Sequence, residues 1–373
     1  QDIEPFSMTF ALRFAQYAYH SACFGKLHHM GPDQMQGWTR RFSGDMEVAD
    51  AFIPGRVEAE FARYQREDGV GKWSNQKEIE RAGIGDSWVN RFDRRAREAA
   101  QDYVLDHFCG SDHDRPTRHR PLLLKLSLLQ PHYPYQIDAE RFNYYLNRVP
   151  IYQEACCEHP RLSRTQMGPD VQATTRDIRR VTAAYYGMID SMDDHYARLA
   201  ASLAEVGEDL DEWIIVYTSD HGEMLGQHGI WEKTQFYEAS VKVPLIISWP
   251  KGFAGGRRLS ENVNLCDLFA TLCDLCDIPM PAGTDSRSLA PLLRGSDQPW
   301  DNVTISQLGD DYMVKRDALK LIDFSGHAPA VLFDLERDPA EQNNYIDNTA
   351  YAGALSKLQE QLSSYRSLQR KSD

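Results

Sequence analysis

Three stretches of the sequence are almost continuously apolar, without polar alternation, and they cover residues 121–129, 213–218 and 243–249. Such runs are typical of strands that are buried on both faces of a parallel sheet. Between the first two runs, apolar residues recur every three or four positions over 178–203, which predicts a long helix ending at Gly207. A second helix is predicted over 265–276. Strands alternating with helices predict an α/β fold, in which helices cover both faces of a mixed, largely parallel sheet.

The pattern changes after Gly295. Short apolar runs separated by turn residues predict a small antiparallel sheet, and they cover residues 303–307, 312–315, 319–324 and 330–335. An amphipathic helix from Tyr351 to Tyr365 is expected to pack on this sheet. We therefore expect an α/β core over residues 1–298 and a C-terminal subdomain of antiparallel sheet plus helix over 299–373. The polar segments 54–120 and 150–172 show no clear pattern and are expected to be long excursions from the sheet.

The charge of the chain narrows the classes of partner. There are 41 Lys and Arg against 55 Asp and Glu, and the resulting net charge of −14 disfavours binding to a nucleic-acid backbone. No apolar stretch approaches the roughly 18 residues of a membrane-spanning helix, so no membrane span is expected. The seven cysteines form no repeated framework, which disfavours a disulfide scaffold. No leader-like segment is visible at Gln1, so the compartment is left open, with a bacterial cytoplasm or periplasm as the expectation.

The residues that follow the predicted strands point to chemistry, because ligands of an open α/β sheet bind beyond the carboxyl ends of its strands. Lys26 and His28 follow a short predicted strand at 21–24, and His132 follows the first apolar run. Asp220 and His221 follow the second apolar run, and Lys233 lies shortly downstream of them. A carboxylate suits a hard divalent cation. Lysine and imidazole donors can neutralise charge that develops on a transferring group. Together they predict a metal beside a tetrahedral oxyanion.

Each of these residues also has an ordinary structural interpretation. A lysine or histidine after a strand is usually a solvated loop residue, and an aspartate there often only caps the next helix. Gly222 favours a site, because it removes side-chain bulk where the backbone could approach a ligand. Because all these features occur together at strand ends, a functional site is favoured over the ordinary structural interpretation.

Several motifs resemble those of type I sulfatases, in the alkaline-phosphatase superfamily. Residues 217–238, containing the run Ser-Asp-His-Gly, are similar to the C-terminal signature of that family. The segment 25–28 (Gly-Lys-Leu-His) resembles its Gly-Lys-x-His motif, and 131–135 resembles its Pro-His-x-Pro-Tyr motif. The resemblance extends over nearly the whole chain. Residues 31–34 (Gly-Pro-Asp-Gln) are similar to the choline-sulfatase branch, over a shorter stretch.

The resemblance implies an alkaline-phosphatase-like fold and a role for each matching residue. Asp220 and His221 would contact a divalent cation, Ca²⁺ or Mg²⁺. Four residues would surround the sulfate, with His28 as the general base and Lys233 or His132 assisting the leaving oxygen; they are Lys26, His28, His132 and Lys233. Five neighbours are candidates for contacts with the rest of the substrate, although core packing or a solvated loop explains each equally well; they are His29, Asp33, Gln34, Tyr133 and Trp231.

The sequence departs from the family in its nucleophile. Sulfatases use a formylglycine made from a Cys/Ser-x-Pro-x-Arg motif, and none of the seven cysteines stands in such a motif. The family's N-terminal pair of metal-binding aspartates is also absent. We expect the formylglycine and these aspartates to lie upstream of Gln1, which leaves residues 1–373 with half a metal site.

The leading hypothesis is therefore a sulfuric-ester hydrolase acting on the sulfate ester of a small organic molecule or a carbohydrate. A phosphonate monoester or phosphodiester hydrolase of the same superfamily and a non-catalytic, truncated homologue are the alternatives. The final helix leaves a homo-oligomer open.

Overall fold

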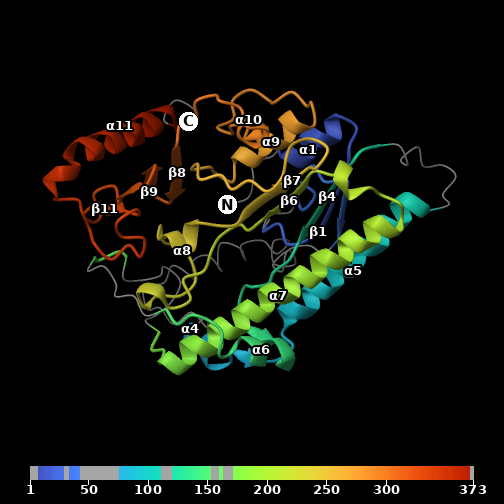
Figure 1. The fold of residues 1–373 in the computed structure, drawn as a ribbon, viewed down its shortest axis with the longest axis horizontal. Helices are drawn as coiled ribbons and strands as arrows, with labels where there is room; N and C mark the ends of the chain where they lie inside the picture. The colour runs from blue at the N-terminus through green and yellow to red at the C-terminus, as the bar shows by residue number, and fades with distance from the viewer. Residues whose placement is uncertain are drawn as a thin grey trace. The chain divides into compact units, whose positions relative to one another are not determined.

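The fold is given by a computed structural model, which describes residues 7–28, 33–42, 75–110, 120–152, 159–162 and 171–369. The chain divides into two compact units (Figure 1). Unit 1 comprises residues 1–151 and 172–213, and unit 2 comprises residues 152–171 and 214–373. Within the described ranges, no helix combines the length and apolar character needed to cross a membrane.

Unit 1 contains a three-stranded parallel sheet in the order β2-β1-β4 and a second, two-stranded parallel sheet of β3 and β5. Its strands are β1 (His20–Gly25), β2 (Arg40–Phe42), β3 (Gly83–Ile84), β4 (Leu122–Ser127) and β5 (Gln136–Ile137). Its helices are α1 (Phe10–Gln16), α4 (Asn75–Glu80), α5 (Trp88–Cys109), α6 (Ala139–Tyr145), α7 (Thr175–Glu205) and the short 3₁₀ turn η2 (Leu210–Glu212).

The three-stranded sheet is covered on both faces, because successive side chains of a strand point to opposite sides. Ala22 and Phe24 of β1 pack against α5 and α7 in one apolar cluster. Cys23, between them, packs on the other face against Ala11 of α1 and Trp38. This layering confirms the prediction of a parallel sheet between helices, and β1, β4 and α7 lie where the apolar pattern predicted them.

Helix α5 has 22 residues, and it falls in the segment where the sequence showed no pattern. The helix begins at its N-cap Ser87, whose side chain accepts from the backbone N–H of Asn90. Its buried stripe consists of small or polar residues, including Asn90, Asp93, Ala96 and Ala100. An apolar period does not appear when the buried side chains are alanines and an aspartate, and this is why the helix was missed.

Unit 2 contains a two-stranded sheet of β6 and β7 and a four-stranded antiparallel sheet in the order β11-β10-β9-β8. Its strands are β6 (Ile215–Thr218), β7 (Leu245–Ser248), β8 (Val303–Leu308), β9 (Asp311–Arg316), β10 (Leu319–Asp323) and β11 (Val331–Asp334). Its helices are η3 (Gln227–Gly229), α8 (Glu238–Val241), α9 (Asp267–Leu275), α10 (Ala290–Arg294), η4 (Thr349–Tyr351) and α11 (Ala352–Gln369).

The four-stranded sheet is also covered on both faces (Figure 1). Val314 and Leu321 pack on Leu358 and Leu362 of α11, as predicted for the final helix. On the other face, Met313 and Ile322 pack in one cluster with side chains from the segment after β6; those side chains are Met224, Ile230, Phe236 and Tyr237. The long segment between β6 and β7 is therefore part of the core of unit 2.

Two expectations for this unit need correction or stay open. The prediction that β6 and β7 belong to a parallel sheet and are buried on both faces is wrong, since they pair antiparallel, and Ile215 and Ile246 are 43% and 60% exposed. An apolar run contains no information on strand direction, and in β6 and β7 it did not indicate burial on both faces either. The contacts place residues 214–298 with the C-terminal sheet, so the boundary near residue 298 stays a prediction.

Candidate functional site

The predicted site residues fall into two sets, one on each unit, and each set is described on its own unit. On unit 1, the set is organised by the parallel pairing of β1 and β4, in which Gly25 is in register with Ser127. The two strands therefore end together, and the residues that follow them emerge at the same edge of the sheet. Lys26 confirms this continuity, because its backbone N–H donates to the carbonyl oxygen of Ser127 at 3.0 Å.

Gly25 allows the two strand ends to approach this closely. Its φ of +94° is in the left-handed region, and a Cβ at this position would lie 1.9 Å from the carbonyl oxygen of Ser127. The chain then leaves the sheet with Lys26 half-buried and His28 exposed, at a φ of +60°. The Gly-Lys-x-His motif thus has a structural reason for its glycine, which is contact between two strands.

His132 lies in the segment after β4, and its neighbours define its tautomer. Its ring Nδ1 is 3.0 Å from the backbone oxygen of Tyr133, and its backbone N–H donates to Leu129. Because a carbonyl can only accept, this contact places the proton on Nδ1 and the lone pair on Nε2. The rings of His132 and Tyr133 lie 4.1 Å apart. The imidazole is thereby oriented by its own loop.

Asp93 of α5 holds this loop, although no pattern in the sequence indicated this residue. The side chain is fully buried, and its two carboxylate oxygens accept from the backbone N–H groups of Leu129 and Gln130 at 2.7 and 2.8 Å. Burial raises the pKa of Asp93 to about 7, against the two hydrogen bonds, which favour the ionised form. The loop that carries His132 is therefore fixed by a carboxyl group that titrates near neutral pH.

The remaining candidates on unit 1 have local structural contacts. Asp33 caps a turn, since its carboxylate accepts from the N–H groups of Met35 and Gln36. Gln34 accepts from the guanidinium of Arg41 through both its side chain and its backbone oxygen. These contacts correspond to the structural alternative given for both residues, and a role toward substrate stays a prediction. His29 lies outside the described residues.

On unit 2, Asp220 and His221 follow β6 directly. The Asp220 side chain is 62% exposed, and its Oδ1 lies 3.8 Å from Nε2 of His221. His221 Nδ1 is 2.8 Å from the carbonyl oxygen of Gly222, which places the proton on Nδ1 and the lone pair on Nε2. A carboxylate oxygen and an imidazole lone pair are thus presented side by side, as metal ligation requires.

Gly222 has a different purpose from the one that the sequence suggested. A Cβ at this position would lie 2.0 Å from the carbonyl oxygen of Ala239, and the N–H of Gly222 donates to Ser240. The close approach is therefore to the chain's own α8 segment. Gly222 ties the Asp-His pair to the segment that follows Lys233.

Lys233 is half-buried in a tightly bent segment, between Glu232 and Thr234, which both have positive φ. The carboxylate of Glu223 fixes this segment by accepting from the backbone N–H of Glu232 at 2.6 Å. Trp231 is only 3% exposed, so it contributes to the interior. A contact between Trp231 and substrate stays a prediction, with the packing interpretation favoured by its burial.

A buried ion cluster anchors the far end of the same segment. Lys320 of β10 has no exposed surface, and its Nζ donates to Glu341, to Glu238 and to the carbonyl oxygen of Phe236 at 2.7–2.8 Å. Burial raises the pKa of Glu341 in spite of Lys320. The pKa of Glu238 is lowered: burial opposes this change, and the charges of Lys320 and Lys315 outweigh it. We call Lys320, Glu341 and Glu238 the Lys320 cluster.

A divalent cation would have few ligands here. In the part of the chain that the structure describes, no group of three or more His, Cys, Asp or Glu side chains could hold a metal ion. Asp220 and His221 offer two donors of suitable chemistry, whereas Ca²⁺ takes about six to eight ligands and Mg²⁺ about six. The described residues do not complete a metal site by themselves, so no chemical step is assigned to a metal below.

Comparison with known proteins gives a consistent result. A family profile described as sulfatase matches residues 9–278, and one described as the C-terminal part of N-sulphoglucosamine sulphohydrolase matches residues 226–368. The chain is 28% identical over 362 residues to a choline-sulfatase of Rhizobium meliloti and 27% identical over 371 residues to an arylsulfatase of Clostridium perfringens. These alignments cover 91% and 92% of the chain, and 67% and 74% of the two relatives.

Solved structures show the same fold at lower sequence identity. The phosphonate monoester hydrolase of Agrobacterium radiobacter superimposes with a TM-score of 0.73 at 21% identity, over 98% of this chain and 81% of that one. A protein solved in complex with its substrate D-glucosamine-2-N,6-O-disulfate superimposes with a TM-score of 0.71 at 17% identity, over 100% and 84%. At these identities the likeness establishes the fold alone, and it agrees with the mixed α/β class predicted from the sequence.

Proposed function

The chain belongs to the sulfatase family, and on this premise we propose that it supplies the sulfate-holding residues of a sulfuric-ester hydrolase. The substrate class is the sulfate ester of a small organic molecule or a carbohydrate. The named activities of its relatives, choline-sulfatase and arylsulfatase, support this class. The nucleophile would come from a formylglycine segment beyond these 373 residues, because no cysteine here stands in the required motif.

The observation that carries the proposal is the arrangement of the strand ends in unit 1. Pairing of Gly25 with Ser127 brings the ends of β1 and β4 to one edge of the sheet. Lys26 and His28 leave from the first strand and His132 from the second. A cationic amine and two imidazoles at one sheet edge suit the tetrahedral anion of a sulfate ester, since the amine and a protonated imidazole can donate to its oxygens.

The proposed mechanism gives each side chain a limited task. Lys26 and Lys233 bind sulfate oxygens and neutralise the charge that develops on them. His132, whose Nε2 is presented by the Nδ1 contact to Tyr133, would carry a second proton on Nε2 when substrate is bound and donate it to the leaving oxygen. His28 is proposed as the general base. Asp220 and His221 are proposed as two of the ligands that a divalent cation would need.

A phosphonate monoester hydrolase is the second candidate. The fold match to the Agrobacterium radiobacter enzyme favours it, and the same lysines and histidines suit a phosphonate as well as a sulfate. The two candidates differ in the bond that they hydrolyse fastest, which is the ester bond of a sulfate in one case and that of a phosphonate in the other. A non-catalytic homologue is the third possibility, and it is distinguished by the absence of any turnover.

A substrate panel tests the proposal. The protein should be expressed from the coding sequence immediately upstream of Gln1 through Asp373, with Ca²⁺ or Mg²⁺ present. We expect turnover of a chromogenic aryl sulfate and of choline sulfate to exceed that of an aryl phosphonate. Faster phosphonate turnover would establish the second candidate, and no turnover of any substrate by a protein containing the nucleophile motif would contradict both enzymes.

A further inference from the structure

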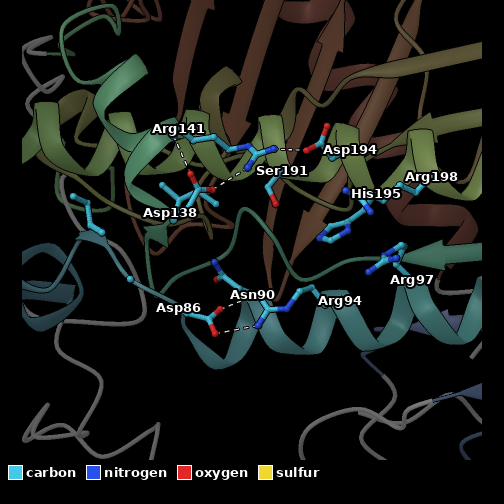
Figure 2. A pocket seen from close by; sticks show the side chains of 13 residues that line it. Asp86, Asn90, Arg94, Arg97, Asp138, Arg141, Ser191, Asp194, His195 and Arg198 are labelled. Carbon is cyan, nitrogen blue, oxygen red and sulfur yellow. Dashed lines mark hydrogen bonds and ion pairs between the residues drawn. The ribbon is translucent and has the colours of Figure 1, made fainter.

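Unit 1 contains a cleft that none of the proposed catalytic residues lines. It lies between α5 and α7, encloses about 510 Å³, and includes residues of β5 and α6 in its wall (Figure 2). A volume of this size is within the range of small-molecule sites, about 300–1,000 Å³. We call it the His195 cleft, after a buried histidine of α7 that lines it.

Only some of the charged side chains that line the His195 cleft pair with one another. Four guanidinium groups face three carboxylates, and two of the four are committed to ion pairs within the cleft. Arg94 donates to both oxygens of Asp86, at 2.9 and 3.0 Å. Arg141 pairs with Asp138 at 2.9 Å and also with Asp194. The other two arginines form no ion pair with the carboxylates that line the cleft, although Arg97 is bonded to Gln101 and Glu98 outside it.

One end of the cleft is formed by Arg97, Arg198 and His195. In the described ranges, the side chain of Arg198 has no hydrogen bond or ion pair. Arg97 is 12% exposed, and its terminal nitrogens donate to Gln101 and Glu98, while its Nε is buried without a hydrogen-bond partner among the described residues. Figure 2 shows the ring of His195 reaching from α7 toward α5, where Arg97 lies.

His195 itself supports a ligand at this end. Its side chain is 8% exposed, and its Nδ1 is buried without a hydrogen-bond partner among the described residues. An unpartnered buried polar atom is unfavourable, and a ligand that hydrogen-bonds to it removes that cost. Burial, followed by the charges of Arg97 and Arg198, lowers the pKa of His195 to about 4, although Asp194 acts in the opposite direction and Arg94 reinforces the shift.

We propose that the His195 cleft binds a small polar molecule carrying a sulfate or phosphate group, with the oxyanion held by Arg97 and Arg198. A bare ion would leave most of the 510 Å³ unfilled. Ser191 lines the remaining space and offers a hydroxyl to the hydroxyl groups of such a molecule. Guanidinium groups bind these oxyanions by charge-assisted hydrogen bonds. Binding here requires no catalytic turnover and is independent of the proposed hydrolysis.

NMR of the histidine rings of the full chain tests the proposal, with the His195 signal assigned from a His195→Gln variant. Glucose 6-sulfate, glucose 6-phosphate, inorganic sulfate and glucose are titrated separately. We expect saturable shifts of the His195 signal with the anions and none with glucose, and a higher His195 pKa in the bound state, because an anion offsets Arg97 and Arg198. Tighter binding of the sugar esters than of inorganic sulfate would identify the organic part as a contributor, and the reverse would identify the bare ion as the ligand.

Arg198→Ala should weaken anion binding about tenfold, as expected for losing one charge-assisted contact. Arg198 is exposed, so the fold should tolerate its truncation. The matched control is Arg176→Ala, which removes an exposed arginine of the same helix outside the cleft. The proposal is overturned if no anion shifts the His195 signal, if chloride at equal ionic strength shifts it equally, or if the two variants lose the same affinity. None of these results depends on whether the protein hydrolyses sulfate esters.

Discussion

The loop after β4 and the segment after β6 both carry proposed catalytic residues, yet they are held in different ways. The β4 loop, with His132, is fixed by one buried carboxylate, Asp93, whose interactions are two backbone N–H groups. The β6 segment, with Lys233, is fixed by the Lys320 cluster and by an apolar core. A single buried carboxylate responds to pH, whereas a compensated ion cluster responds mainly to the loss of one member.

The largest expected effect is on the β6 segment. Lys320→Met leaves Glu341 buried without its cation, and removing one partner of a buried ion pair costs about 3–5 kcal/mol. The measurement is the free energy of unfolding in urea. Lys315→Met is the control, because Lys315 pairs with Glu238 while Lys320 remains, and about 1 kcal/mol is expected. Equal losses in the two variants would contradict the anchoring role of the cluster.

The next effect concerns the pH dependence of the β4 loop. Asp93 has a folded pKa of about 7, above the ordinary aspartate value of 3.8, so the folded protein binds more protons than the unfolded chain between these pH values. Stability from this group is therefore fully present below pH 3.8 and is lost as pH rises toward 7, by up to about 1.4 kcal/mol per pH unit.

Asp93→Asn removes this titration. In urea denaturation between pH 4 and 8, the wild type should lose stability relative to the variant up to about pH 7 and then run parallel to it. Parallel profiles over the whole range would show that Asp93 is ionised throughout. The carbon-13 signal of the Asp93 carboxyl group provides a direct check, with an expected midpoint near pH 7.

The smallest expected effect is on thermal stability, when the glycine that allows the segment after β6 to pack on α8 is replaced. Gly222→Ala would bring a Cβ to 2.0 Å from the carbonyl oxygen of Ala239, and overpacking of this kind costs about 1–3 kcal/mol. Gly255→Ala is the matched control in the same unit, since a Cβ there meets nothing within 4 Å. A thermal unfolding midpoint that falls only in Gly222→Ala is expected. An unchanged midpoint in that variant would refute the close approach of α8.

The positions of the strand ends could be predicted from the sequence. The buried charged residues that anchor the segments after them could not. Lys26, His132 and Asp220 became candidates because each follows a predicted strand, and two of these strands, β4 and β6, are marked by an apolar run. Asp93 and Lys320 carry no such mark. Asp93 lies on a helix stripe in which polar residues and alanines interrupt the apolar pattern, and Lys320 stands in a strand where an isolated lysine is normally exposed. Their burial depends on partners 36 and 21 positions away, Leu129 and Glu341, which no local pattern connects.

The direction of strand pairing and the long-range packing of unit 2 also could not be predicted from the local pattern. The apolar runs at β6 and β7 indicated two strands correctly, but their antiparallel pairing depends on how the segment between them folds back. That segment is apolar at Met224, Ile230 and Phe236 because it packs on the C-terminal sheet. A boundary placed at the change in pattern after Gly295 could not reveal this packing.

We propose that these 373 residues hold the sulfate group and that the nucleophile comes from a formylglycine segment outside them. One aryl sulfate assay tests it, comparing the chain alone, the protein extended by its upstream coding sequence, and the extended protein with His132→Ala. We predict no turnover by the chain alone, turnover by the extended protein, and a loss of about 10²–10³ in kcat on His132→Ala. Metal-dependent turnover by residues 1–373 alone, abolished by His132→Ala, would contradict the account, because the nucleophile would then lie within this chain.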